Sequence, residues 1–303
     1  MQIGMVGLGK MGANMTRRLL EGGHDVVAFD IDPNAVKAVE DHGARGASSI
    51  EELVGALSAP RAVWVMVPSG RITDETIQEV AAHLGRGGII VDGGNSRYSD
   101  SEGHARTLGM LGIGFIDAGT SGGIWGLKEG YCLMVGGEAD DFSRLEPIFA
   151  TLAPQGGFEH VGPAGAGHFT KMVHNGIEYA LMQAYGEGFE LLHDSEYKID
   201  VNRVAKVWQH GSVIRSWLLD LATNALDGDP NLSDIAAYVE DSGEGRWTLE
   251  TAIERAVPAP TIAAALFARF ASRQDLSYAA KLVAALRKEF GGHAVRSSEG
   301  TQA

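Results

Sequence analysis

The first half of the chain alternates short β-branched apolar runs with amphipathic stretches and glycine-rich turns. This alternation predicts strands separated by helices, which is the pattern of parallel βαβ units. The predicted strands are 2–6, 25–29, 62–67, 88–92, 114–118 and 132–136, and the predicted helices between them are 12–21, 33–42, 50–56, 72–83 and 99–112.

After residue 164 the pattern changes to long helical runs with few glycines. The predicted helices are 167–194, 200–211, 214–226, 247–255, 261–271 and 278–289. We therefore predict an α/β Rossmann-type N-terminal domain over residues 1–164 that binds a dinucleotide. An all-α C-terminal domain for substrate binding and oligomerisation is predicted to follow over residues 165–303.

Composition and charge narrow the class of partner. Hydrophobic residues make up 45% of the chain and charged residues 21%, an ordinary globular composition. With 25 Lys and Arg against 39 Asp and Glu, the net charge is −14, and no basic run is present, which argues against nucleic-acid binding. Uniformly apolar runs such as 62–67 fall far short of the roughly 20 residues that a membrane span needs. We therefore expect a small-molecule ligand, with local cations wherever that ligand is anionic.

Cysteine and histidine positions predict neither a disulfide nor a metal site. Cys132 is the single cysteine, and its apolar surroundings predict a buried side chain. The chain opens directly into a strand-like run without a charged leader and an apolar core, so we expect a cytoplasmic protein. Four histidines lack the spacing to cysteines or acidic residues that metal ligands have: His160, His168, His193 and His210.

A glycine motif after the first predicted strand points to a dinucleotide. Gly7, Leu8, Gly9, Lys10, Met11 and Gly12 match G-x-G-x-x-G between a strand and a helix. In such a motif the first glycine makes the tight turn, the second lets the pyrophosphate approach, and the third lets helix and strand pack closely. The free N–H groups of the helix N-terminus then face the phosphates. The alternative is a glycine-rich turn with a purely structural role.

An acidic residue at the end of the second predicted strand bears on the choice of cofactor. Asp30 can accept hydrogen bonds from both ribose hydroxyls of NAD and would repel the 2′-phosphate of NADP. The segment Asp30-Ile31-Asp32 contains no arginine, so we expect NAD, with NADP disfavoured. The alternative is that Asp30 caps the helix near Pro33, a role for which Asp32 is better placed.

One predicted helix carries an unusual mixture of polar side chains. Lys171, His174, Asn175, Glu178 and Tyr179 lie at helical spacing, within roughly 140° of one face. A solvated helix face is the alternative, but such faces are typically rich in glutamate and lysine, unlike this mixture of five chemical types. This face is therefore the candidate catalytic surface.

Several segments together resemble the 6-phosphogluconate dehydrogenases, which are decarboxylating enzymes of the β-hydroxyacid dehydrogenase superfamily. The resemblance covers nearly the whole chain, and its narrowest signal is K-M-V-H-N-G-I-E-Y at 171–179. The other segments that carry it are Gly7 to Gly12, D-G-G-N at 92–95, D-A-G-T-S-G-G at 117–123, G-A-G at 165–167, F-A-R at 267–269 and the stretch 287–293.

The resemblance implies NAD-dependent oxidation and decarboxylation of 6-phosphogluconate to ribulose 5-phosphate. It implies that Lys171 is the general base and that Glu178 is the acid that protonates the enediol carbon. It further implies a substrate site in which the carboxylate and hydroxyls meet Asn95, Ser121, Gly122, Gly123, His174 and Asn175, while the phosphate meets Tyr179 and Arg269. Arg287 and His293 would reach that phosphate from a neighbouring subunit of a homodimer or homotetramer. Val67, Pro68 and Asn95 complete the expected cofactor site.

The chain departs from the longer members of the family. It has one apparent copy of the helical domain, where those members have two. In the loop 241–248, Ser242 and Glu244 stand where the long members place lysine and threonine, so we expect that Glu244 is not a direct phosphate ligand. Two alternative functions are a dehydrogenase of an unphosphorylated hydroxy acid, disfavoured by Arg269, Arg287 and His293, and a non-catalytic dinucleotide-binding interaction protein, disfavoured by Lys171 and Glu178.

Overall fold

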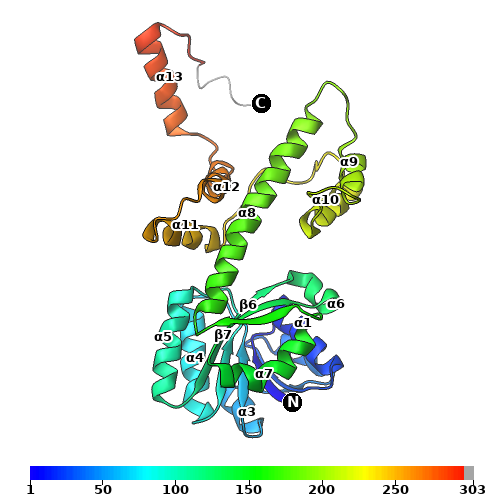
Figure 1. Cartoon of the computed structure of the whole chain (residues 1–303), viewed down its shortest axis with the longest axis vertical. Coiled ribbons are helices and arrows are strands. Elements are labelled where there is room, and N and C mark those ends of the chain that lie inside the picture. The colour runs from blue at the N-terminus through cyan, green and yellow to red at the C-terminus, as the bar shows by residue number, and fades with distance from the viewer. Residues whose placement is uncertain (297–303) are drawn as a thin grey trace. The chain divides into compact units, whose positions relative to one another are not determined.

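The computed structural model describes residues 1–296, and the final residues of the predicted helical domain, 297–303, lie outside the described part. The chain divides into two compact units. Unit 1 comprises Met1–Ile177 together with Glu244–Arg255, and unit 2 comprises Glu178–Gly243 and the chain from Ala256 onward. Helix α8 (Ala166–His193) begins in unit 1 and continues into unit 2 (Figure 1). The domain boundary after residue 164 stays a prediction.

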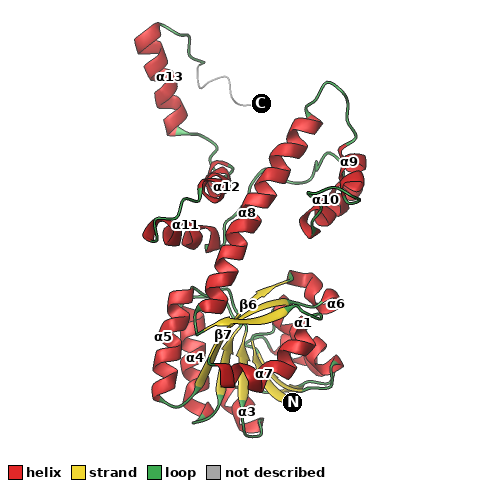
Figure 2. Ribbon diagram, in the orientation of Figure 1, coloured by secondary structure: helices red, strands yellow, loops and turns green. Residues whose placement is uncertain are grey.

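Unit 1 is built on one eight-stranded sheet with the strand order β3-β2-β1-β4-β5-β6-β7-β8, and helices cover both of its faces (Figure 2). The strands are β1 (Gln2–Val6), β2 (Asp25–Phe29), β3 (Arg45–Gly46), β4 (Ala62–Val65), β5 (Ile89–Asp92), β6 (Gly114–Ser121), β7 (Cys132–Gly137) and β8 (Phe158–Gly162). The first six strands run parallel, whereas β7 is antiparallel to β6. A Rossmann-type sheet is therefore present, as predicted.

The helices of unit 1 divide between the two faces because strand residues alternate in direction. Their bounds are α1 (Lys10–Glu21), α2 (Pro33–Glu40), α3 (Ile50–Ala56), α4 (Arg71–Leu84), α5 (Tyr98–Met110), the 3-10 helix η1 (Gly123–Trp125), α6 (Gly126–Glu129), α7 (Ala139–Leu152) and α11 (Glu244–Glu254). On one face α1 and α7 bury Met15, Leu19 and Phe149 against Trp64, while on the other α3 and α4 bury Leu53 and other apolar residues. Burying a large apolar side chain contributes about 1.5–3 kcal/mol, so these two layers stabilise the sheet from both faces.

Helices are the only regular secondary structure among the described residues of unit 2 (Figure 2). Besides the second part of α8, these are α9 (Val201–Trp208), α10 (Trp217–Gly228), α12 (Pro260–Ala271) and α13 (Tyr278–Gly291). Helices α9 and α10 begin at side-chain caps, because Asp200 accepts from the Arg203 N–H and Ser216 from the Leu219 N–H. The all-helical character predicted for the C-terminal part is therefore confirmed.

The prediction of a buried Cys132 is wrong. Its side chain is exposed although Tyr131 before it and Leu133 after it are buried. Successive side chains of a strand point to opposite faces of the sheet, so Cys132 does not share the buried side of Leu133. On the antiparallel partner strand, Ser121 lies directly opposite. Among residues 1–296, no helix combines the length and the apolar character that a membrane crossing requires.

Candidate active site

The glycine motif follows the first strand, as predicted, and lies where the strand order reverses between β1 and β4. In open α/β sheets, ligands bind outside the carboxyl ends of the strands at such a point. Gly7 has φ +95°, and a Cβ atom there would lie 2.4 Å from the Met66 carbonyl oxygen. A Cβ on Gly12 would lie 2.0 Å from the Gly7 carbonyl oxygen. These two glycines are therefore required by close backbone packing.

Gly9 differs from its two neighbours because a Cβ atom there would meet no protein atom within 4 Å. Gly9 is also the N-cap residue of α1, and it makes no side-chain capping hydrogen bond to that helix. The N–H groups of the first turn are thus left for another acceptor, and a helix N-terminus favours an anion. This open position beside an uncapped helix end fits the pyrophosphate of a dinucleotide.

Asp30 closes the same loop from the end of β2. Its carboxylate accepts hydrogen bonds from the Leu8 N–H at 2.6 Å and from the Asp32 N–H at 2.8 Å. The helix α2 is capped by Asp32, which accepts from the Asn34 N–H, so Asp30 is not the cap. Ile31 between the two acids is 93% exposed. Asp30 therefore ties the glycine loop to the edge of the sheet where a ribose would lie.

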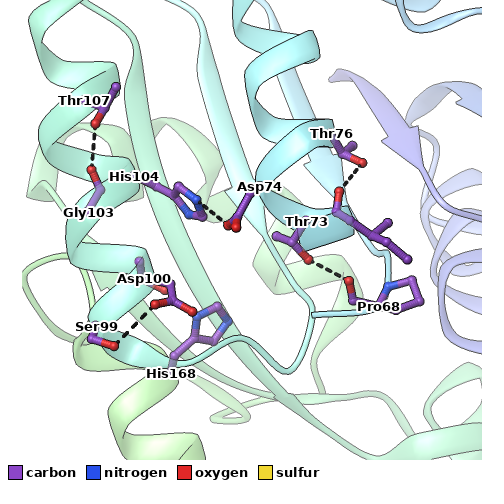
Figure 3. Close-up of polar contacts among 12 residues, drawn as sticks. Pro68, Thr73, Asp74, Thr76, Ser99, Asp100, Gly103, His104, Thr107 and His168 are labelled. Carbon is purple, nitrogen blue, oxygen red and sulfur yellow. Dashed lines mark hydrogen bonds and ion pairs between the residues drawn. The ribbon is translucent and has the colours of Figure 1, made fainter. Parts of the chain in front are cut away.

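The loops after β4 and β5 lie beside the glycine motif. Val67 is half-buried and Pro68 exposed, and the Pro68 carbonyl accepts from Thr73 Oγ1 at 2.9 Å, which fixes this loop to the first turn of α4 (Figure 3). A Cβ on Gly94 would lie 3.0 Å from the Val67 carbonyl oxygen, so the two loops are in contact, and exposed Asn95 follows. The structure therefore gathers the residues predicted for the cofactor at one edge of the sheet.

Helices α4 and α5 flank this edge and are tied to each other. His104 Nε2 on α5 lies 3.0 Å from Asp74 Oδ1 on α4 (Figure 3). The His104 ring also packs edge-on against Phe115 of β6. These contacts therefore fix the positions of the two helices, and with them the loops after β4 and β5 that lead into them.

The start of α8 is fastened to β6 by a carboxylate that the sequence analysis gave no role. Asp117 is fully buried, and its two oxygens accept from the Gly165 and His168 N–H groups, each at 2.8 Å. A carboxylate at a helix N-terminus is favoured by the helix dipole as well as by these bonds. His168 Nδ1 in turn lies 2.7 Å from Ser101 Oγ of α5. No sequence spacing relates these residues, so their pairing could be found only in three dimensions.

This fastening places Lys171 directly over β6. A Cβ on Gly119 would lie 2.5 Å from Lys171 Cβ and 2.7 Å from the Gly167 carbonyl oxygen. Lys171 is 8% exposed, and so is Asn175 one turn later. His174 Nδ1 lies 3.1 Å from Asn175 Oδ1. The predicted residues Ser121, Gly122 and Gly123 end this same strand β6 and begin the turn after it.

Helix α11 packs across α8 within unit 1. Thr248 Oγ1 donates to the Met172 carbonyl at 2.8 Å, and a Cβ on Gly176 would lie 2.8 Å from the Thr248 side chain. Glu244, the first residue of α11, is 3% exposed, and its Oε2 has no hydrogen-bond partner within the described chain. The expectation that Glu244 is not a phosphate ligand stays a prediction.

In unit 2, the predicted phosphate residues Tyr179 and Arg269 lie against each other. The Arg269 guanidinium carbon stands 3.5 Å from the centre of the Tyr179 ring, a cation–π contact. Arg269 Nη1 also donates to the Glu240 carbonyl at 2.8 Å. Ser242 contacts the Tyr179 hydroxyl through its N–H at 3.2 Å. Arg287 lies in α13 and His293 follows that helix, and both are exposed.

Within the described residues, no group of three or more His, Cys, Asp or Glu is arranged to hold a metal ion. The sheet topology, the glycine loop and the helical unit together define an NAD(P)-binding oxidoreductase fold with a helical C-terminal part. The sequence profile "NAD binding domain of 6-phosphogluconate dehydrogenase" matches residues 2–162, and "6-phosphogluconate dehydrogenase, C-terminal domain" matches residues 167–294. The chain therefore belongs to the 6-phosphogluconate dehydrogenase family.

Relatives of two lengths share this similarity. The chain is 45% identical over 294 residues to the YqeC protein of Bacillus subtilis, covering 97% of this chain and 99% of that one. It is 44% identical over 297 residues to the NAD(+)-dependent, decarboxylating 6-phosphogluconate dehydrogenase of Haloferax volcanii, covering 97% and 98%. The solved 6-phosphogluconate dehydrogenase of Plasmodium falciparum superposes with a TM-score of 0.82 at 28% identity, covering 100% of this chain and 67% of that one.

Proposed function

We propose that this protein catalyses the NAD-dependent oxidative decarboxylation of 6-phosphogluconate to ribulose 5-phosphate and CO2. The observation that carries the proposal is the run Lys171, His174, Asn175, Glu178 and Tyr179 along α8, which starts against the carboxyl half of β6. Membership of the family and the name of the Haloferax relative support this assignment.

Lys171 is the proposed general base. It takes the proton from the 3-hydroxyl of the substrate, for which its amine must be neutral when substrate is bound. Bound NAD supplies the acceptor for the hydride that leaves C3. The 3-keto acid then loses its carboxylate as CO2, and the proton held by Lys171 returns to the carbonyl oxygen, which gives an enediol. Glu178 protonates C1 of that enediol while Lys171 takes the enol proton back, which completes the product. Each such positioned proton transfer contributes about 10²–10⁴-fold to the rate.

The remaining predicted residues hold the substrate in this proposal. Polar groups from the loops after β5 and β6 and from α8 bind the carboxylate and the hydroxyls: Asn95, Ser121, Gly122, Gly123, His174 and Asn175. Arg269 and Tyr179 bind the phosphate, for which a guanidinium offers a planar, permanently charged donor. An unphosphorylated hydroxy acid would leave the charge of Arg269 without an anionic partner.

NAD is the proposed cofactor because of Asp30. The end of β2, where the ribose would bind, carries this carboxylate and exposed Ile31. The segment Asp30-Ile31-Asp32 offers no cation to a 2′-phosphate. The hydrogen bond from the Leu8 N–H keeps the carboxylate at the glycine loop. A 2′-phosphate would meet this negative charge at close range.

A second copy of the chain is the proposed partner, as a homodimer or homotetramer. Helix α13 has no buried residue within a single chain. Its exposed apolar side chains include Leu282, Leu286 and Phe290, the last of which is 96% exposed. Exposed apolar surface of this extent is typical of a helix that packs on another subunit. Arg287 and His293 would then complete the phosphate site of the neighbour.

One set of assays tests the proposed reaction. The purified protein is supplied with 6-phosphogluconate and NAD, with 6-phosphogluconate and NADP, and with 3-hydroxyisobutyrate and each cofactor, while reduced cofactor and CO2 are measured. We expect equal amounts of NADH and CO2 from 6-phosphogluconate. Turnover of 3-hydroxyisobutyrate in its place would overturn the proposed substrate, and a higher kcat/KM with NADP would overturn the role of Asp30.

Two variants test the division of roles between Lys171 and Glu178. Lys171→Met is expected to abolish oxidation itself, because the 3-hydroxyl loses its base. The second measurement is the exchange of solvent tritium into C1 of ribulose 5-phosphate in the presence of NADH. Glu178→Gln is expected to slow this exchange far more than Lys171→Met does. Exchange at the wild-type rate in Glu178→Gln would show that another group protonates the carbon.

A further inference from the structure

Four consecutive residues of unit 2, 239–242, are each held by a contact to α12, to the two residues that follow it, or to Tyr179. The contacts are Val239 N–H to Ser272 Oγ at 3.0 Å, the Glu240 carbonyl to Arg269 Nη1 at 2.8 Å, Asp241 Oδ2 to Arg273 Nη2 at 2.9 Å, and Ser242 N–H to the Tyr179 hydroxyl at 3.2 Å. We call residues 239–242 the tethered segment. Because the segment has no helix or strand structure of its own, these contacts set its course.

The tethered segment ends beside the two proposed phosphate ligands. Ser242 Oγ lies 3.4 Å from the Tyr179 hydroxyl, and the Ser242 residue is exposed. Arg269 bridges the Tyr179 ring and the Glu240 carbonyl. A shift of this segment would therefore move Ser242, which contacts the Tyr179 hydroxyl. It would also move the Glu240 carbonyl, which helps to orient the Arg269 guanidinium.

Asp241 carries a buried negative charge, which needs a positively charged partner. Its side chain is 3% exposed, and the Arg273 side chain with which it pairs is 25% exposed. A buried carboxylate costs several kcal/mol in free energy unless it is paired and hydrogen-bonded. Asp241 is also next in sequence to Ser242, so its negative charge lies close to where a phosphate dianion would bind. Arg273 both tethers this carboxylate and offsets its charge.

Arg273 is itself oriented by its surroundings. Its guanidinium carbon lies 5.2 Å from the centre of the Phe270 ring, within the range of a cation–π contact. It follows Arg269 by four residues, just past the end of α12. Arg269 and Arg273 thus hold adjacent residues of the tethered segment, Glu240 through its carbonyl and Asp241 through its carboxylate.

We propose that Arg273 is a positioning residue for recognition of the substrate phosphate. It acts through Asp241 to hold the tethered segment against Tyr179 and Arg269. This inference rests on the proposed function, because it assumes that Tyr179 and Arg269 bind a phosphate. Arg273 itself lies outside every segment that carries the family resemblance.

The test compares Arg273→Gln with Arg203→Gln, which removes an exposed arginine from α9 and so makes the same change in net charge. Arg273→Gln is expected to raise the KM for 6-phosphogluconate about tenfold, the scale of one lost charge-assisted hydrogen bond, with kcat within threefold of wild type. Gluconate has the same carboxylate and hydroxyls without the phosphate, so its Ki as a competitive inhibitor should change less than twofold. Arg273→Lys, which keeps a cation, should recover most of the KM.

The route through Asp241 is tested by a double variant. Asp241→Asn alone should also raise the KM, and Asp241→Asn combined with Arg273→Gln should raise it no further than Arg273→Gln alone. Fully multiplicative increases would overturn the coupling. Should Arg273→Gln fail to fold, Asp241→Asn decides in its place: a raised KM with an unchanged gluconate Ki supports the proposal, and an unchanged KM overturns it.

Two further outcomes separate this inference from the proposed function. Equal increases in the 6-phosphogluconate KM and the gluconate Ki would overturn the inference, because the effect would then not concern the phosphate. A wild-type KM in folded Arg273→Gln would overturn the inference and leave the proposed function standing. A wild-type protein that does not oxidise 6-phosphogluconate would overturn both.

Discussion

At the scale of single residues, the glycines of the cofactor loop serve two different purposes. Gly7 and Gly12 are enclosed by backbone atoms, so a methyl group has no room at either position. Gly9 faces open space, and its backbone angles, φ −58° and ψ −175°, suit an alanine. One motif thus contains glycines needed for folding and a glycine whose missing side chain leaves room for a ligand.

We therefore expect opposite results from two alanine substitutions. Gly9→Ala should leave the free energy of unfolding within about 0.5 kcal/mol of wild type, since it meets no atom, and should weaken NAD binding at least tenfold. Gly12→Ala should lower the free energy of unfolding by more than 1 kcal/mol, because its Cβ overlaps the Gly7 carbonyl. Urea unfolding and titration with NAD measure the two effects. Unimpaired NAD binding by Gly9→Ala would show that the pyrophosphate does not approach this residue.

His24 links the start of β2 to the end of α7. Its Nε2 lies 2.7 Å from Thr151 Oγ1, whose hydroxyl donates to the Pro147 carbonyl at 3.1 Å. Burial lowers the pKa of His24 below its ordinary value of 6.5. The unfolded chain therefore binds this proton at a higher pH than the folded chain does. As a result, the free energy of unfolding should fall as the pH drops below about 6.5.

Replacing His24 by Gln, which keeps an N–H donor for Thr151, should remove that part of the pH dependence. The measurement is the urea midpoint at pH 7.5 and at pH 5.0 for wild type, His24→Gln and the exposed control His42→Gln. Wild type and His42→Gln should lose more stability between the two pH values than His24→Gln. Equal losses in all three proteins would mean that His24 does not carry the effect.

At the scale of elements, the position of the proposed base depends on how closely α8 approaches β6. The approach is possible because Gly119 presents no side chain to the helix, and because Asp117 binds the helix N-terminus. Gly167 contributes from the helix side, since a Cβ there would lie 2.3 Å from the Asp117 carbonyl oxygen. Small residues at facing positions therefore decide where Lys171 stands above the strand.

Gly119→Ala should displace the first turns of α8 and lower kcat/KM for 6-phosphogluconate by about 10²-fold, the scale of a misplaced catalytic group. Gly109→Ala on α5 is the matched control, because a Cβ there meets no atom within 4 Å. Steady-state kinetics with a circular dichroism spectrum of each variant make the comparison. A Gly119→Ala enzyme as active as Gly109→Ala would refute the seating of Lys171 by this contact.

The elements that could be predicted from sequence are those whose periodicity is uninterrupted. The bounds of 2–6, 25–29 and 50–56 agree with the structure, as does the long helix to within a residue at each end. Helix α7 is absent from the predicted elements, because a proline such as Pro147 argues against a helix interior. The structure nevertheless has a continuous helix there, and Leu145, Ile148, Phe149 and Leu152 have helical spacing and are all buried. The antiparallel direction of β7 could have been predicted from the length of the connection before it. The connection 122–131 contains only η1 and α6 and is too short for a crossover between parallel strands.

The candidate site could be predicted only as far as its chemistry follows local spacing. The glycine motif and the polar face of α8 are each contained in a short segment. Asp117, His168 and Ser101 meet through contacts between distant parts of the chain, as do Arg273 and Asp241. No periodicity connects such residues, so their pairing required the fold.

At the scale of the whole molecule, the exposed face of α13 sets the expectation for assembly. We expect each proposed phosphate site to be shared between subunits, with Arg287 and His293 supplied by the partner. A chain with Arg287→Ala and a chain with Lys171→Ala are each expected to be inactive alone. When subunits are exchanged, one site of a mixed dimer has both wild-type residues, so activity should return to about a quarter or less of the wild-type value, because at random half of the dimers are mixed.

Native mass spectrometry on the mixture establishes whether exchange has taken place, and it gives the oligomeric state directly. Mixtures of either variant with itself serve as the control. Mixed oligomers that stay inactive would show that Arg287 acts within its own chain.

The exposed position of Cys132 has a practical consequence. Because it is the single cysteine and lies opposite Ser121 of the neighbouring strand, a thiol-reactive fluorophore would label the protein at one place, beside the turn that begins at Gly122. Emission from that dye should change when a ligand binds beside the turn. The natural sequence thus already carries an attachment point for following substrate binding in real time, with no engineered cysteine and no background labelling to subtract.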